Sequence, residues 1–353
     1  MKTRFALLIF VVLALVVTGF AQQQAAPQQQ QQQQAQAPAG PPPLTEKEVT
    51  KMLKKERPQA IIQEVTQRGV DFDMTPEIEK QLRKKKATDE VVAAVRNAGP
   101  TARAAAAKLA AMGGHGVTIP PEEAQAWEAI RNELDPDKQI ALANDFAQKY
   151  PDSPILTYVY AFEAGAYQQK GDVEQVVEAC QKSLKVKPDN LMSLIMIAAM
   201  LPQPQYVGKH EMEKAKILTQ TEEYGQQALK QINDITKQPN ETEEAYQKRK
   251  EGYAAAVHAA LGMVHLERSS MALMGPDKGE LAKAEQEFKL AIAGTPNPDP
   301  RDYYRLGEAY SLDGKIDDAI AAFTKAGELG QGTMIKSYAD QRIADLQKKK
   351  AGK

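Results

Sequence analysis

Residues 303–323 read YYRLGEAYSLDGKIDDAIAAF, and their spacing dictates the architecture that we expect. A first helix, a glycine turn and a second helix are marked by Tyr303, Leu306, Gly307, Tyr310, Gly314, Ala319 and Phe323. The first four lie three or four residues apart and therefore share one helix face. Gly307 and Ala319 are small, so the two helices can approach closely, while Phe323 fills the space beside them. This spacing specifies packing rather than a chemical reaction.

The same spacing recurs twice upstream. Residues 160–188 repeat it with Tyr160, Ala164, Tyr167, Gly171, Val176, Cys180, Ser183 and Pro188. Residues 253–296 repeat it with Leu261, Gly262, Ala284, Phe288, Ala291 and Pro296, provided that the insertion SSMALMGPDK lengthens the turn. Cys180 falls where Phe323 falls in the later repeat, so we expect it to pack in the interior rather than to act as a nucleophile.

These residues resemble the fingerprint of the tetratricopeptide repeat. Residues 122–154 and 190–234 fit as degenerate copies. The resemblance implies an all-α fold, an α-solenoid of roughly five helix pairs over residues 119–333, with a C-terminal cap helix and tail at 334–353. It also implies a right-handed superhelix whose concave groove is usually a platform for other proteins.

In this family the first helix of each pair lines the groove. Residues offset from the packing face give the candidate partner-binding set, which is Tyr158, Phe162, Gln168, Met263, Arg301, Tyr304, Arg305 and Glu308. Aromatic, Met and Arg side chains are enriched at protein interfaces. The set is therefore either a binding groove or an ordinary tolerated surface. The Lys/Asn clamp of the chaperone-binding members is not evident, which argues against capture of acidic C-terminal tails.

The first 43 residues predict export. Lys2 and Arg4 precede an apolar run over residues 5–17, and small residues follow, which is typical of a signal peptide at residues 1–21 cleaved after Ala21. An uncleaved membrane anchor is the alternative. Residues 22–43 are rich in Gln and Pro and predict a disordered tether.

Residues 44–98 predict a small helical module, with Thr45, Thr75 and Thr88 as N-terminal caps. The basic run Arg83–Lys86 either binds anions or complements the negative end of a helix. Residues 99–118 are a predicted linker, because GGHGVTIPP breaks any helix.

Composition favours a non-catalytic protein. The chain has 45 Lys and Arg against 46 Asp and Glu, so no net charge favours nucleic acid. With one cysteine and four histidines, a metal cluster is implausible, and no cofactor motif is present. We expect no enzyme activity, no cofactor, no metal and no nucleic acid, and membrane contact only through an uncleaved signal segment. The expected partner of this periplasmic or secreted protein is a protein or peptide. The alternative function is a structural accessory subunit of an envelope enzyme or export complex.

Overall fold

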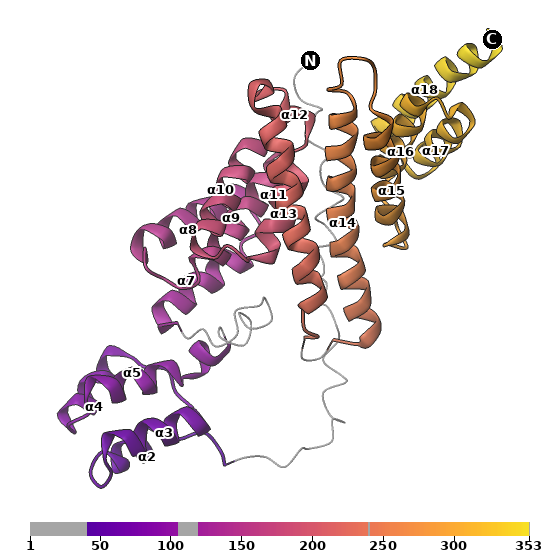
Figure 1. Cartoon of the computed structure of the whole chain (residues 1–353). Helices are drawn as coiled ribbons and strands as arrows, with labels where there is room; N and C mark the ends of the chain where they lie inside the picture. The colour runs from indigo at the N-terminus through magenta and orange to yellow at the C-terminus, as the bar shows by residue number, and fades with distance from the viewer. Residues whose placement is uncertain (1–40, 105–118, 239–240, 353) are drawn as a thin grey trace. The chain divides into compact units, whose positions relative to one another are not determined.

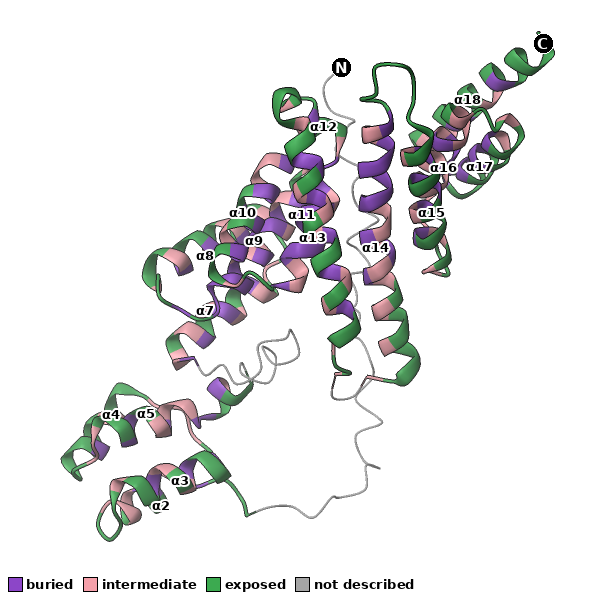
Figure 2. Ribbon diagram, in the orientation of Figure 1, coloured by how far each residue is buried: buried purple, intermediate pink, exposed green. Residues whose placement is uncertain are grey.

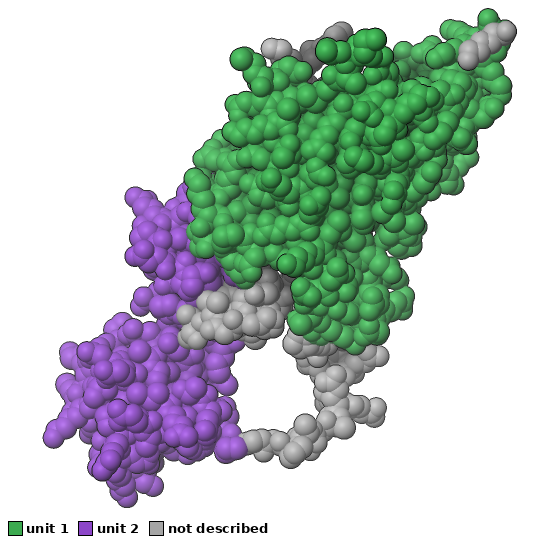
Figure 3. Space-filling view, viewed as in Figure 1, with its two compact units in different colours: residues 1–24, 163–353 green, residues 25–162 purple. Residues whose placement is uncertain are grey.

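The computed structural model describes residues 41–104, 119–238 and 241–352. Within them the fold is all-α, as predicted, and the β-type pairing is an isolated bridge between Leu44 and Val70. The predicted signal peptide, most of the tether and residues 105–118 of the linker lie outside the described residues. The chain divides into two compact units between residues 162 and 163 (Figure 3). In chain order, the first unit ends at residue 162 (purple, unit 2 in Figure 3), and the second begins at residue 163 (green, unit 1 in Figure 3).

The module at the start of the first unit contains four short helices, labelled in Figure 1. They are α2 (Glu46–Met52), α3 (Pro58–Arg68), α4 (Pro76–Lys84) and α5 (Asp89–Asn97). The side chains of Thr45, Thr75 and Thr88 accept backbone N–H bonds at the starts of α2, α4 and α5, which confirms the predicted caps.

The module consists of two similar helical hairpins. Thr75 and Gly99 follow Thr45 and Gly69 by thirty positions. Part of the buried core follows the same offset, because Val91 and Val95 of α5 correspond to Ile61 and Val65 of α3, and all four are almost fully inaccessible. The offset does not hold in the other two helices, where buried Val49 of α2 corresponds to partly exposed Glu79 of α4. The hairpins α2–α3 and α4–α5 therefore resemble each other, and they pack together mainly through α3 and α5.

Backbone hydrogen bonds close one end of the module, and one of them, from Val70, joins the two hairpins. The Leu44 N–H donates to the Gly69 carbonyl at 2.9 Å, and the Val70 N–H donates to the Ala98 carbonyl at 3.0 Å. The C-terminal ends of α3 and α5 therefore meet, so these helices run in the same direction and both hairpin turns lie at the opposite end. Residues 100–104 stay attached at the joined end, where the Thr101 hydroxyl donates to the Asp73 carboxylate at 2.6 Å.

The remainder of the first unit holds α7 (Pro121–Asn132), α8 (Pro136–Lys149) and the beginning of α9 (Leu156–Lys170). Trp127 and Phe146 are fully buried between these helices. They form the interior of the degenerate helix pair expected at residues 122–154.

The second unit is a stack of consecutive helices. It comprises the rest of α9, α10 (Val173–Val186), α11 (Leu191–Met200), α12 (Pro204–Val207), η2 (Glu211–Glu213), α13 (Lys214–Asp234), α14 (Glu243–Ser269), α15 (Lys278–Ala293), α16 (Pro300–Asp313), α17 (Ile316–Leu329) and α18 (Met334–Ala351). From α13 onward each helix packs against its neighbour in sequence. Figure 2 shows the buried residues on the sides of these helices that face one another. None of the described helices is long and apolar enough to cross a membrane.

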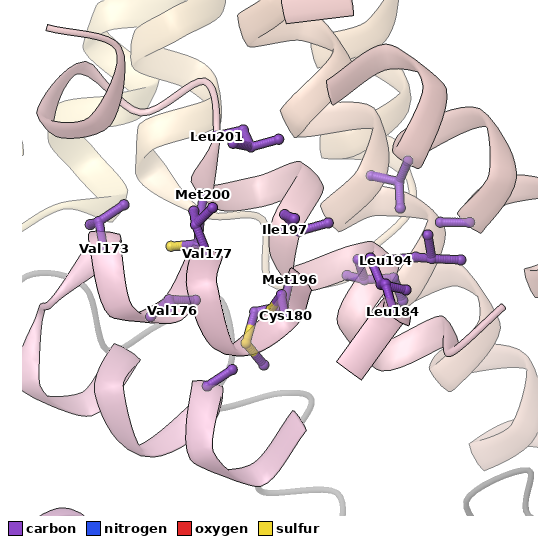
Figure 4. Packing of buried hydrophobic residues seen from close by; sticks show 14 of the residues in the cluster. Val173, Val176, Val177, Cys180, Leu184, Leu194, Met196, Ile197, Met200 and Leu201 are labelled. Atoms are coloured by element: carbon purple, nitrogen blue, oxygen red, sulfur yellow. The ribbon is translucent and has the colours of Figure 1, made fainter. Parts of the chain in front are cut away.

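Small residues allow the two helices of a pair to pack closely together. A Cβ atom on Gly307 would lie 2.9 Å from the Phe323 ring, and one on Gly262 would lie 2.7 Å from the Phe288 ring. In the earlier repeat Ala164 replaces the glycine, and the smaller Cys180 replaces the phenylalanine; both side chains are fully buried in one cluster. Cys180 is buried in the cluster that Figure 4 draws, which confirms its predicted interior position.

Candidate partner-binding surface

Four of the eight predicted residues lie together on α16. This helix begins at Asp299, whose carboxylate accepts the Arg301 N–H at 2.8 Å. The Arg301 guanidinium also donates to the Asp299 carboxylate, with Nε 2.9 Å from Oδ2. Arg301, Tyr304, Arg305 and Glu308 are all partly buried, so each keeps some surface open to solvent.

The cap helix α18 completes this surface. The Arg342 guanidinium lies 3.4 Å from the Glu308 carboxylate, which also lies 3.8 Å from Arg305. The Tyr304 ring meets the Phe323 ring edge-on at 5.1 Å, and burial together with the Glu308 charge raises the pKa of its hydroxyl. We call Tyr304, Arg305, Glu308 and Arg342 the α16–α18 face. It offers an aromatic ring, two guanidinium groups and a carboxylate.

Asp302 lies beside this face with an altered acidity. Burial, followed by repulsion from the Asp299 carboxylate, raises its pKa to about 7. The charges of Arg301 and Arg305 act in the opposite direction but do not cancel the effect. Its side chain is therefore only partly ionised at neutral pH.

The other four predicted residues are placed differently. Tyr158, Gln168 and Met263 are at least nine-tenths buried, so in this structure their side chains pack against protein rather than face solvent. Phe162 is partly buried and meets the Trp127 ring edge-on at 5.1 Å. Tyr158 and Phe162 belong to the first compact unit and the other six to the second.

Two histidines on α14 pair with glutamates of α15. The Nδ1 atom of His258 lies 2.6 Å from Glu287, and that of His265 lies 2.7 Å from Glu280. These histidines stand where other repeats carry tyrosines, and the sequence alone does not reveal their glutamate partners. Among the described residues, no group of three His, Cys, Asp or Glu side chains could hold a metal ion.

Glu163 is a buried carboxylate on α9 that sequence reasoning also missed. Only 2% of the residue is exposed, and its Oε2 atom has no hydrogen-bond partner. Burial raises the pKa of this carboxyl, which Lys182 offsets only in part. Its register gives the reason, because Glu163 precedes Ala164 as Leu306 precedes Gly307. A carboxylate therefore occupies a packing position.

Comparison with known proteins identifies the repeats. A family model described as tetratricopeptide repeat matches residues 158–190 and 303–329. The chain is also similar to a crystal structure of a thermophilic TPR protein from Thermus thermophilus, with 19% identity, 63% of this chain and 96% of that chain covered, and a TM-score of 0.36. It is similar to PilW, titled a widely conserved type IV pilus biogenesis factor, with 16% identity, 64% and 88% coverage, and a TM-score of 0.37. No curated protein matches.

Proposed function

We propose that this chain, which carries tetratricopeptide repeats at residues 158–190 and 303–329, is a non-catalytic scaffold that binds a segment of another protein at the α16–α18 face. The observation that carries the proposal is that α16 buries some of its side chains and leaves others partly exposed to solvent. Leu306 and Gly307 are buried against neighbouring helices, whereas Tyr304 and Arg305 remain partly open.

The chemistry of the α16–α18 face suits a protein partner. Tyr and Arg side chains dominate the energetics of many protein interfaces. Arg342 and Arg305 both approach Glu308, so the charges are already oriented before a partner arrives. A partner carboxylate that displaces Glu308 would receive two guanidinium groups, which bind carboxylates in a planar, bidentate manner.

Export and domain organisation belong to the same proposal. The apolar run over residues 5–17 supports a signal peptide at 1–21, followed by the 22–43 tether, the 44–98 module, the 99–118 linker, the 119–333 array and the 334–353 cap and tail. N-terminal sequencing of the secreted or periplasmic protein should begin at Gln22. A first residue of Met1 would favour the uncleaved anchor instead.

Site-specific photo-crosslinking tests the binding surface. A photoreactive amino acid at position 305 should crosslink one discrete protein in the native envelope, whereas the same group at Thr324, which is exposed on α17, should not. The variant Arg305→Glu should abolish the crosslink made from position 304, and the matched variant Lys325→Glu on α17 should preserve it. Equal crosslinking from positions 305 and 324 would contradict the proposal.

Stoichiometry separates the two functional classes. A scaffold that captures a partner reversibly should recover it in proportion to its concentration. A structural accessory subunit would instead co-purify with an envelope complex at one fixed ratio.

A further inference from the structure

The module at residues 44–104 carries an unusual concentration of unpaired positive charge. In the two hairpin turns and on α4, seven exposed cations form no ion pair or side-chain hydrogen bond with any described residue, and they are Lys54, Lys55, Arg57, Lys80, Lys84, Lys85 and Lys86. Lys47 and Lys51 on α2 are exposed and form no such contact either. Arg83 is different, because it contacts the carboxylates of Glu79 at 2.8 Å and Asp89 at 2.6 Å. Nothing in the packing of the module requires seven free cations.

The packing of α3 against α5 brings these cations together. Three of them lie in the α2–α3 turn, and the other four lie along the last two turns of α4 and in the α4–α5 turn. The hydrogen bond from Val70 to Ala98 holds the C-terminal ends of α3 and α5 together, so both turns lie at the other end. We call residues 51–57 and 80–90 the basic end of the module.

Charge is separated along the module. The basic end contains nine basic and three acidic side chains, a net charge of +6. The acidic ones are Glu56, Asp89 and Glu90, all exposed. The rest of residues 44–104 contains four basic and seven acidic side chains, a net charge of −3. The whole chain has a net charge of −1, so this field is local to the module.

Helix dipoles do not account for the basic end. Cations stabilise the negative C-terminal end of a helix, which explains Lys51 and Lys84. Arg57, however, is the N-cap of α3, at the positive end of that helix, and its side chain makes no capping bond. Lys86 has φ 69°, a left-handed conformation that Gly or Asn adopts more readily. Neither Arg57 nor Lys86 is favoured by its local backbone conformation. What the two residues share is a positive charge.

We propose that the basic end binds a surface of anionic phospholipid headgroups. Clusters of four to eight Lys and Arg residues are typical of proteins that associate with anionic lipid. Six of the seven free cations are lysines, which act as mobile point charges suited to a fluid array of phosphates. The module also directly follows the predicted signal segment and tether, so export would deliver it beside a membrane.

Nucleic acid is the less favoured polyanion. Single-stranded nucleic acids are usually held by aromatic rings that stack on the bases. The aromatic residue of the module, Phe72, lies in the α3–α4 connection near the joined end and not among the free cations. The arginine best placed for bidentate recognition, Arg83, is already engaged by two carboxylates.

Vesicle co-sedimentation with the full mature chain tests the proposal. The chain should sediment with vesicles of phosphatidylcholine mixed with phosphatidylglycerol and stay in solution with pure phosphatidylcholine. Raising the salt from about 0.1 M to about 0.5 M should lower binding at least tenfold, because screening shortens electrostatic reach. Equal binding to both vesicles would overturn the proposal.

Charge-reversal variants locate the binding surface. The variants Lys54→Glu/Lys55→Glu and Lys84→Glu/Lys85→Glu should each weaken binding, and the four changes combined should lower it at least tenfold. The control Lys348→Glu/Lys349→Glu alters an equally exposed lysine run on α18 and should bind normally. Unchanged circular dichroism would establish that the variants fold, and the milder Lys→Gln changes serve if they do not.

Three further results would overturn the assignment. The quadruple variant could bind as well as the unmodified chain, which would place the contact elsewhere. A single-stranded DNA oligonucleotide could bind more tightly than the vesicles, which would favour nucleic acid. Inorganic phosphate at about 10 mM could displace the vesicles while equal ionic strength of sodium chloride does not, which would indicate a discrete phosphate site.

Discussion

Glu163 is the residue where the repeat pattern and the side chain disagree. Its register matches that of Leu306, and its Oε2 atom is buried without a partner. A buried polar group without a partner costs roughly 1–3 kcal/mol. The carboxyl has a raised pKa in the folded state, so the folded protein retains a proton that the unfolded chain releases. The contribution of Glu163 to the free energy of unfolding therefore decreases as the pH rises above the ordinary pKa of a glutamate.

We predict that Glu163→Leu stabilises the second unit by about 1–2 kcal/mol at pH 8. The gain should shrink as pH falls towards 4, because the wild-type carboxyl is then protonated in both states. Urea unfolding at several pH values measures it. Leu306→Glu, at the equivalent position, should destabilise the protein. A gain that does not depend on pH would contradict the explanation.

At the scale of elements, a small residue on one helix of a pair is matched by a large residue on the other. The later repeats combine glycine with phenylalanine, whereas the earlier one combines Ala164 with Cys180. We predict that Gly307→Ala destabilises the protein by about 1–3 kcal/mol, because the added Cβ would lie 2.9 Å from the Phe323 ring. In a Phe323→Cys background the same change should cost almost nothing. A double-mutant cycle measures the coupling, and strictly additive effects would refute it.

The cap helix α18 covers the end of the array. Ala339 and Leu346 bury the apolar surface of Ala319, Phe323 and Ala326. We predict that ending the chain at Thr333 lowers the melting temperature and causes concentration-dependent self-association, because the exposed apolar surface seeks another partner. Gel filtration across a concentration series measures the association. Lys348→Ser/Lys349→Ser leaves Leu346 in place and should remain monodisperse; identical behaviour of the truncated chain would show that α18 is dispensable.

The sequence predicts elements better than it predicts surfaces. Helix pairs and caps were predictable because small residues, aromatics and threonines act locally and recur at fixed intervals. Arg342 was missed because it reaches Glu308 from a helix more than thirty residues away. Tyr158, Gln168 and Met263 were chosen by helix register alone, and register does not reveal which neighbours cover a helix face. The similarity of the two hairpins in the module was missed because they share few identical residues.

At the scale of the whole molecule, the described residues hold separate cores. The buried cluster of the module draws only on residues 44–98, whereas Phe323 lies in a cluster confined to α16–α18 and their turns. We predict at least two unfolding transitions. Ile61→Ala should cost the module about 2–5 kcal/mol and shift one transition only, while Phe323→Ala should shift another. Differential scanning calorimetry resolves them, and a single transition that both variants shift would contradict independent cores.

The backbone bonds of Leu44 and Val70 have a mechanical consequence. The chain enters and leaves the module at the same end, across hydrogen bonds from Leu44 to Gly69 and from Val70 to Ala98. Tension between the preceding and following segments would load these bonds one after another, as in a zipper, rather than all together in shear. The module should therefore yield at low pulling force and lengthen the chain before the helix pairs of the array give way.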